Sequence, residues 1–71
     1  MDMQTFIREI GKKDYGVVSF NTYHQSGVPM CYIMIAERGD SGHFIKRECT
    51  DFKLNETLDM LLIEVKGGKW K

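Results

Sequence analysis

Residues 30–36 read Met30-Cys31-Tyr32-Ile33-Met34-Ile35-Ala36 and form the longest uninterrupted apolar run in the chain. Pro29 precedes this run, and Glu37-Arg38-Gly39-Asp40 closes it. A run of this length between turn residues predicts a β-strand rather than a helix. A strand with one solvated side would alternate apolar and polar residues, whereas this one is apolar on both sides. We therefore expect a central strand whose second face is covered or binds a partner.

Two further strands are predicted on either side of the central run. Residues 15–23 form the first strand and residues 24–29 a loop, in which Gly27 and Pro29 break the pattern. A glycine-containing hairpin loop at 38–42 leads into a third strand at 43–49. The third strand carries Lys46, Arg47 and Glu48, and such charges are typical of an edge strand.

Helical spacing of apolar residues predicts one helix at each end of these strands. Asp2 is a suitable N-cap for the first helix, and Gly11 is a natural stop. Asn55 is the expected N-cap of the second helix, which ends at 67–68. The apolar stripes are Met3, Phe6, Ile7 and Ile10 in the first helix and Leu58, Leu61, Leu62 and Val65 in the second.

The order helix-strand-strand-strand-helix predicts an α+β fold with two layers. Two hairpins give a three-stranded antiparallel sheet, and the simplest arrangement places both helices on one of its faces. A chain of 71 residues has room for one domain with a thin core, so we assign residues 1–71 to a single domain.

The register of the second hairpin divides the side chains between the two faces of the sheet. Centring this hairpin on Asp40 places Ile35 opposite Ile45 and Cys31 opposite Cys49. The face expected to form the core carries Val18, Phe20, Cys31, Ile33, Ile35, Ile45 and Cys49. We expect two buried thiols, although the two cysteines are placed so that they can form a bridge if oxidised.

The opposite face is the first candidate site. It is expected to carry Tyr23, Met30, Tyr32, Met34 and Phe44, with Val17 and Ser19 nearby and Lys46 at its end. Exposed apolar surfaces rich in Tyr and Met usually mark partner-binding sites. A homodimer through this face, or cover by the loop and the C-terminal tail, would explain the same pattern.

Composition argues against several classes of function. Ten basic and ten acidic residues give a net charge of zero, whereas a general nucleic-acid binder or a polybasic membrane anchor needs a basic excess. There is no apolar stretch of about 20 residues, and the first residues lack the pattern of a signal peptide, so we expect a cytoplasmic protein.

Catalytic, cofactor and metal motifs are not found in the sequence. His24, His43, Cys31 and Cys49 are of metal-ligand type, but His43 and Cys49 are separated by roughly 20 Å along one predicted strand and cannot share an ion. There is no nucleophile motif, phosphate loop or dinucleotide fingerprint. The sequence therefore predicts no enzyme, no cofactor and no metal site.

A nucleic-acid-binding module is the alternative class. The predicted order of elements is also that of the double-stranded-RNA-binding domain, which places lysines at the start of its last helix. Here that helix starts Asn55-Glu56-Thr57-Leu58-Asp59, which would repel phosphates. Tyr32 and Phe44 could instead stack on bases, with Lys46 as the one nearby cation.

The segments Phe6-Ile7-Arg8-Glu9-Ile10 and Lys13-Asp14-Tyr15 resemble the N-terminus of a small phage-encoded anti-CRISPR family that inhibits the type II effector nuclease. The turn at 38–42 and the ending at 65–70 fall at similar places. The resemblance implies a helix, three strands and a helix, and a DNA mimic whose carboxylates fill the nuclease's basic DNA-entry cleft. By position, Asp14 and Glu37 or Asp40 would be those carboxylates.

These observations predict a small protein that acts by binding another protein. In its sharper form the chain is a phage or mobile-element antagonist of a host defence nuclease, working in the host cytoplasm.

Overall fold

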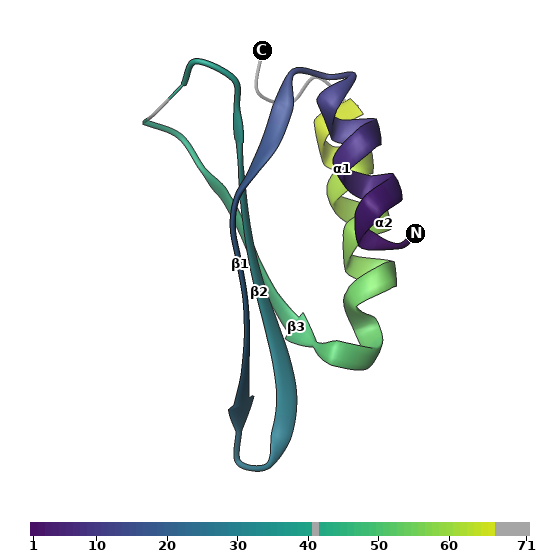
Figure 1. Cartoon of the computed structure of the whole chain (residues 1–71), viewed down its shortest axis with the longest axis vertical. Coiled ribbons are helices and arrows are strands. Elements are labelled where there is room, and N and C mark those ends of the chain that lie inside the picture. The colour runs from purple at the N-terminus through teal and green to yellow at the C-terminus, as the bar shows by residue number, and fades with distance from the viewer. Residues whose placement is uncertain (41, 67–71) are drawn as a thin grey trace.

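The computed structural model describes residues 1–40 and 42–66. Its elements are α1 (Met3–Gly11), β1 (Tyr15–Gln25), β2 (Val28–Glu37), β3 (Ile45–Thr50), the short 3₁₀ turn η1 (Asp51–Lys53) and α2 (Leu54–Lys66). The strands form one antiparallel sheet in the order β1-β2-β3, with β2 in the centre. Figure 1 shows both helices on the same side of this sheet. The predicted α+β architecture is confirmed.

The register predicted for the second hairpin is also confirmed. Ile35 lies opposite Ile45, and Cys31 lies opposite Cys49. We call the side of the sheet that the helices cover the inner face and the other side the outer face. Because paired residues share a face, the β2 residues Cys31, Ile33 and Ile35 point to the inner face, where they are buried.

The first hairpin differs from the sequence prediction because residues 24–29 do not form a loop. A two-residue turn at Ser26 and Gly27, with φ values of 53° and 80°, extends the ladder to the pair Gln25 and Val28. Such a turn needs positive φ at both central residues, and glycine adopts it without strain. Pro29 fits within β2 because β3 pairs only as far as Met30, so no third strand needs an N–H from Pro29.

A β-bulge at Val18 corrects the predicted faces of β1. Val17 pairs with Ile35 and Ser19 pairs with Met34, so Val18 has no partner of its own. Val18 was expected in the core and is 54% exposed, whereas Val17 was expected on the outer face and packs against the core. One extra residue reverses the side-chain alternation between Val17 and Ser19.

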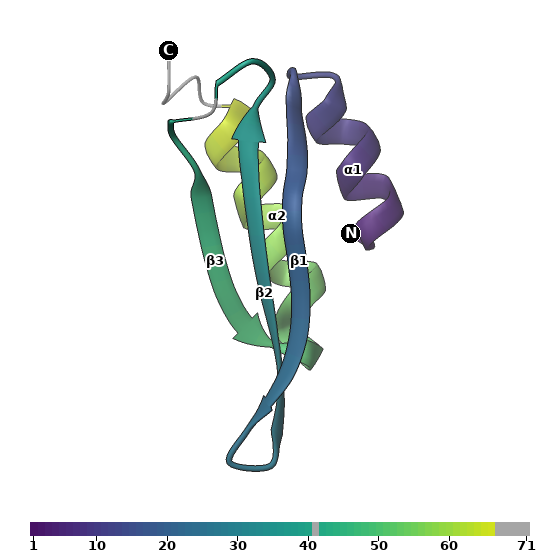
Figure 2. The same cartoon turned by 60° about the vertical axis from the view of Figure 1, so that its left-hand side comes forward.

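Phe20 is a second correction to the expected core. It pairs with Ile33 on the inner face as predicted, but it is 38% exposed. Its partner Ile33 is buried under the helices, whereas Phe20 lies on the edge strand β1, which α1 flanks only along its upper part (Figure 2). The end of the β1–β2 hairpin runs beyond the helices (Figure 1). Phe20 belongs to the inner face of the sheet without belonging to its core.

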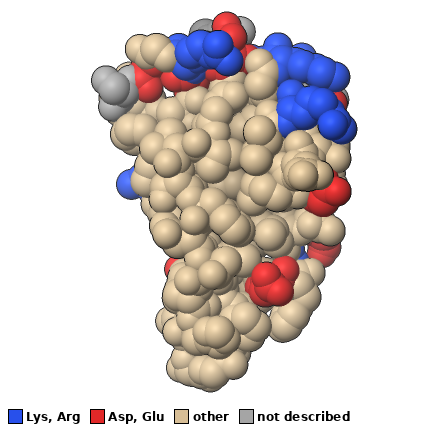
Figure 3. All heavy atoms as spheres, viewed as in Figure 1, with Lys and Arg blue, Asp and Glu red and all other residues tan. Residues whose placement is uncertain are grey.

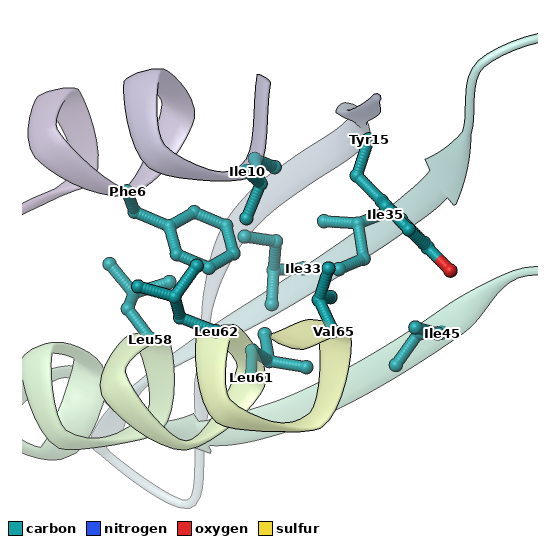
Figure 4. Packing of buried hydrophobic residues seen from close by; sticks show 10 residues of the cluster. All are labelled: Phe6, Ile10, Tyr15, Ile33, Ile35, Ile45, Leu58, Leu61, Leu62 and Val65. Carbon is teal, nitrogen blue, oxygen red and sulfur yellow. The ribbon is translucent and has the colours of Figure 1, made fainter. Parts of the chain in front are cut away.

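The core lies between the inner face and the two helices. Figure 4 shows side chains from both helices and all three strands converging on Ile33 and Ile35. The cluster comprises Phe6, Ile10, Tyr15, Ile33, Ile35, Ile45, Leu58, Leu61, Leu62 and Val65. The predicted stripe of the second helix is thus confirmed in full. In α1, by contrast, Ile7 is about half exposed, because a nine-residue helix buries only the side that carries Phe6 and Ile10.

The helix ends are held by local hydrogen bonds and ion pairs. Asp2 caps α1 as predicted, because its carboxylate accepts from the backbone N–H of Thr5 at 2.8 Å. The second helix begins two residues earlier than expected, because η1 leads directly into Leu54 and Asn55 lies within the helix instead of capping it. An ion pair between Arg47 and Glu64 joins β3 to α2. The predicted stop at 67–68 lies outside the described residues.

The two cysteines are free thiols with different exposure. Cys31 is buried, as predicted, whereas Cys49 is only partly buried. Burial, followed by a hydrogen bond at 3.5 Å from Sγ to the carboxylate of Asp51, raises the pKa of Cys31 to about 11. At neutral pH, Cys31 is therefore a protonated and unreactive thiol.

A thiol reagent is expected to label Cys49 in the native protein and Cys31 only after unfolding. Labelling of the variant Cys49→Ser, followed by mass spectrometry, isolates the rate at Cys31. Because the pKa of Cys31 is raised from 9.0 to about 11, the unfolded chain loses this proton first. The free energy of unfolding should thus fall as the pH rises between these two values. Rapid native labelling of Cys31 would contradict its burial.

The distribution of charge sets the first hairpin apart from the rest of the molecule. Residues 15–36 contain no Asp, Glu, Lys or Arg, although the chain has twenty such side chains in all, ten of each sign. The projecting lower part of the molecule is correspondingly without charged atoms in Figure 3, whereas the opposite end carries charges of both signs. Two long strands of the sheet are thus uncharged over nearly their full paired length.

Candidate functional site

The outer face is built from three columns of side chains, one from each strand. The central column is Met30, Tyr32 and Met34 of β2; the flanking columns are Tyr23, Asn21 and Ser19 of β1 and Thr50, Glu48 and Lys46 of β3. Each residue of the central column lies directly between one partner from β1 and one from β3. The structure therefore brings the predicted residues Tyr23, Met30, Tyr32 and Met34 together on one face.

Neither α1 nor α2 covers this face. Both helices pack on the inner side, and Figure 1 shows the outer side of the sheet without a helix along its length. Met30, Tyr32 and Met34 are each partly buried by their neighbours in the sheet, but part of each side chain remains accessible. The alternative that residues 24–29 cover this face does not hold, because these residues extend the hairpin instead. The predicted cover by the C-terminal tail concerns residues outside the described part of the chain.

A shallow hollow adjoins this face at the end nearest the β2–β3 hairpin. It has a volume of about 370 Å³, and its apolar lining includes Gly16, Val18, Ala36 and Phe44. Gly16 pairs with Ala36 on the outer face, and the bulge brings Val18 to the same end of the sheet. Phe44, predicted for this face, is exposed and lines the hollow. Because the bulge has no sequence signal, the role of Val18 here could not be predicted.

Two hydroxyl groups lie in one row of the outer face and have no hydrogen-bond partner among the described residues. Tyr23 and Thr50 flank Met30 on either side, and the oxygen atoms of both side chains are buried. A buried hydroxyl without a partner costs free energy, because it has lost its hydrogen bonds to water. Among the described residues, the row Tyr23-Met30-Thr50 of the outer face is thus where buried side-chain hydroxyls lack hydrogen bonds.

We expect Tyr23→Phe to raise the free energy of unfolding by about 1 kcal/mol, because it removes an unpaired buried hydroxyl and keeps the ring. Tyr32→Phe is the matched control, since the Tyr32 hydroxyl is not among the buried unpaired atoms and its removal should change little. Urea denaturation of the three proteins measures the difference. A loss of stability in Tyr23→Phe would show that the hydroxyl has a partner in the folded protein.

The three predicted carboxylates lie near one another at the same end of the sheet but do not form an acidic surface. Asp14 is in the α1–β1 turn with φ of 65°, and its carbonyl accepts from the backbone N–H of Arg38 at 2.7 Å. The guanidinium of Arg38 lies 3.9 Å from the Asp14 carboxylate. Glu37 pairs with Tyr15 across the strands. Lys12 and Lys13 precede Asp14, so positive and negative charges mix here.

Asp40 is committed to the structure of its own loop. Its carboxylate accepts from the backbone N–H of Gly42 at 2.9 Å and lies 3.1 Å from the ring of His43. The hydrogen bond from Gly42, with a smaller contribution from His43, lowers the pKa of Asp40. Burial, followed by the charges of Glu37 and Asp40, raises the pKa of Tyr15. The Asp40 carboxylate therefore stabilises the β2–β3 loop through its hydrogen bonds, which leaves it less available for contact with a partner.

Sequence reasoning missed a second set of exposed apolar side chains, on the helical side. Met60 and Ile63 of α2 and Phe52 of η1 are the most exposed large apolar residues, at 66%, 68% and 76%. The positions of Met60 and Ile63 off the stripe Leu58, Leu61, Leu62 and Val65 were visible in the helical spacing, whereas Phe52 precedes that helix. Met60 and Ile63 lie three residues apart on the exposed side of α2, so a substitution there is a control for substitutions on the outer face.

Comparison with known proteins places the chain in no family. No protein-family model, curated protein or solved structure matches it. Among residues 1–40 and 42–66, no helix is long and apolar enough to cross a membrane. In the same ranges, no group of three or more His, Cys, Asp or Glu side chains is placed to hold a metal ion.

Proposed function

We propose that the chain is a small binding domain that docks another protein on the outer face of its sheet. The observation that carries the proposal is a column of Met30, Tyr32 and Met34 on a sheet face that neither helix covers. Tyr and Met are enriched where proteins meet, since both give large contact areas and Met adapts its shape to the partner. A two-layer fold normally leaves polar residues on the solvent side of an antiparallel sheet.

Tyr32 is the expected anchor of this interface. It occupies the middle of the central column, between Asn21 of β1 and Glu48 of β3. Binding energy concentrates in central aromatic residues that become fully desolvated in the complex. The polar and charged residues of the flanking columns, Asn21, Lys46 and Glu48, would then lie around the apolar centre and set the orientation of the partner.

The hollow beside Val18 and Phe44 provides a socket for one apolar side chain of the partner. Its volume of about 370 Å³ is larger than a single side chain needs, and it opens at the same end of the sheet as Met34. Glu37, Arg38 and Asp40 also line the hollow, so charged groups of both signs surround the apolar part. An apolar residue with a polar neighbour in the partner would match this arrangement.

The sharper form of the proposal names a phage-type antagonist of a host defence nuclease. The grouping of Asp14, Glu37 and Asp40 at one end of the sheet is the observation in its favour. Because Arg38, Lys12 and Lys13 accompany these carboxylates, we expect the apolar outer face rather than DNA mimicry to supply the contact. A DNA-cleavage assay with purified type II effector nuclease tests this form: undiminished cleavage at saturating protein overturns it and leaves protein binding in place.

Nucleic-acid binding has little physical support. The first turn of α2 carries Glu56, and the outer face carries Glu48 two residues after Lys46 on β3, so neither surface has a basic excess.

The deciding experiment is capture of host proteins by immobilised wild-type chain and by Tyr32→Lys side by side. A protein retained by the wild type and lost from the variant supports the outer face, whereas equal retention by both overturns it.

A further inference from the structure

The two free edges of the sheet differ in the features that keep strands apart. The β3 edge carries Lys46, Arg47 and Glu48 within a strand of six residues. The β1 edge belongs to a strand of eleven residues and has no charged residue and no proline. Natural proteins protect exposed edges with charges, prolines or bulges. On β1 the bulge at Val18 is the one such device, and it leaves residues 19–25 regular.

This segment begins level with the helices, where Phe20 pairs with the buried Ile33, and its end near Gln25 runs beyond them (Figure 1). Figure 2 shows α1 beside the upper part of β1, whereas the lowest stretch of the strand, next to the turn, is accompanied by β2 alone. Phe20, on this edge strand, is exposed although it points to the inner face. A strand that added to this open, uncharged edge would cover the exposed aromatic ring.

The hydrogen-bonding groups of this edge can be assigned from the hairpin. In a two-residue turn, the flanking pair Gln25 and Val28 is hydrogen-bonded, and bonded pairs alternate with non-bonded pairs along the ladder. Phe20, Thr22 and His24 therefore direct their backbone N–H and C=O groups toward the open edge.

We propose that a second copy of this chain adds to this edge, so that two β1 strands pair antiparallel about a two-fold axis through Thr22. Residues 19–25 are centred on Thr22, so Phe20 of each copy faces His24 of the second copy. Three outward residues in each copy give about six backbone hydrogen bonds. A second copy fits because the segment carries no charge that self-pairing would oppose, and two-fold pairing covers both Phe20 rings.

The resulting six-stranded sheet would join the outer faces of the two copies. Asn21 of one copy would lie opposite Tyr23 of the second copy on that side. The edge of β1 is distinct from the outer face, so this pairing does not depend on the proposed partner of that face.

Sedimentation velocity from about 1 to 300 µM tests the pairing. The wild type is expected to shift from monomer to dimer across this range. Thr22→Lys and Thr22→Glu are each expected to weaken dimerisation at least tenfold, because like charges then face one another at the two-fold axis. An equimolar mixture of these two variants is expected to dimerise again, since the charges that meet at the axis then have opposite signs. Circular dichroism confirms that each monomer is folded.

Each alternative outcome overturns the proposal. A wild type that remains monomeric throughout excludes the second copy as the occupant of this edge. Dimers of the Thr22→Lys variant by itself place the contact elsewhere, and a mixture that stays monomeric excludes the register centred on Thr22. The variant Tyr32→Lys distinguishes this proposal from the proposed function of the outer face. It should dimerise like the wild type even if it no longer binds the protein partner of the outer face.

Discussion

Replacement of Ile33 by alanine is expected to lower the free energy of unfolding by about 2–5 kcal/mol. Ile33 is 1% exposed and lies at the centre of the cluster formed by both helices and all three strands. The cost combines lost burial of the side chain with a cavity that the thin core fills only in part. A domain of this length has a total stability of roughly 4–11 kcal/mol, so the substitution should remove a large share of it.

Met34→Ala is the matched control for this prediction. Met34 neighbours Ile33 on the same strand but points to the outer face, where it is only partly buried. Its replacement should cost about 1 kcal/mol or less, since no closed cavity forms. Urea denaturation measures both, and Ile33→Val, with an expected cost of about 0.5–1.5 kcal/mol, gives a value if the alanine variant is unfolded. Equal costs for Ile33→Ala and Met34→Ala would contradict the assignment of the two faces.

Replacement of Tyr32 by lysine is expected to weaken partner binding about 30-fold or more while the chain stays folded. A central interface residue typically contributes at least about 2 kcal/mol, and lysine would in addition be desolvated in the complex. In the free protein the new ammonium group lies opposite Glu48 and remains in contact with water, so little stability should be lost. Circular dichroism and isothermal titration with the captured partner measure the two effects separately.

Two further variants locate the interface. Gly16→Leu should also weaken binding, because a Cβ added at Gly16 meets no atom within 4 Å and the rest of the leucine side chain would occupy the hollow. Ile63→Lys places the same charge on the exposed side of α2 and should leave binding unchanged. If Ile63→Lys abolishes binding and Tyr32→Lys does not, the partner docks on the helices. Unfolding of Tyr32→Lys would show that Tyr32 belongs to the core.

The sequence by itself determined the class of fold, the central strand and the second hairpin. The apolar run 30–36 between Pro29 and the 37–40 turn was long enough for a strand and too short for a helix. A compact loop centred on Asp40 then determined the register of the second hairpin. The pairs Ile35–Ile45 and Cys31–Cys49 followed from that register. The stripe of the second helix was equally determined, because helical periodicity over many residues averages out local exceptions.

Only the tertiary structure decided the course of β1 and the extent of the helical layer. A single unpaired residue at Val18 reverses the alternation of every residue before it, and no residue type marks a bulge in a single sequence. Phe20 is exposed although its partner Ile33 is buried, and how far the helices reach across the sheet to its edge strand is a property of packing rather than of periodicity. The alternation of side chains along a strand is a local property, whereas burial depends on which other elements pack against each face of the sheet. The extent of the outer face and the open edge of β1 therefore became visible only in the tertiary structure.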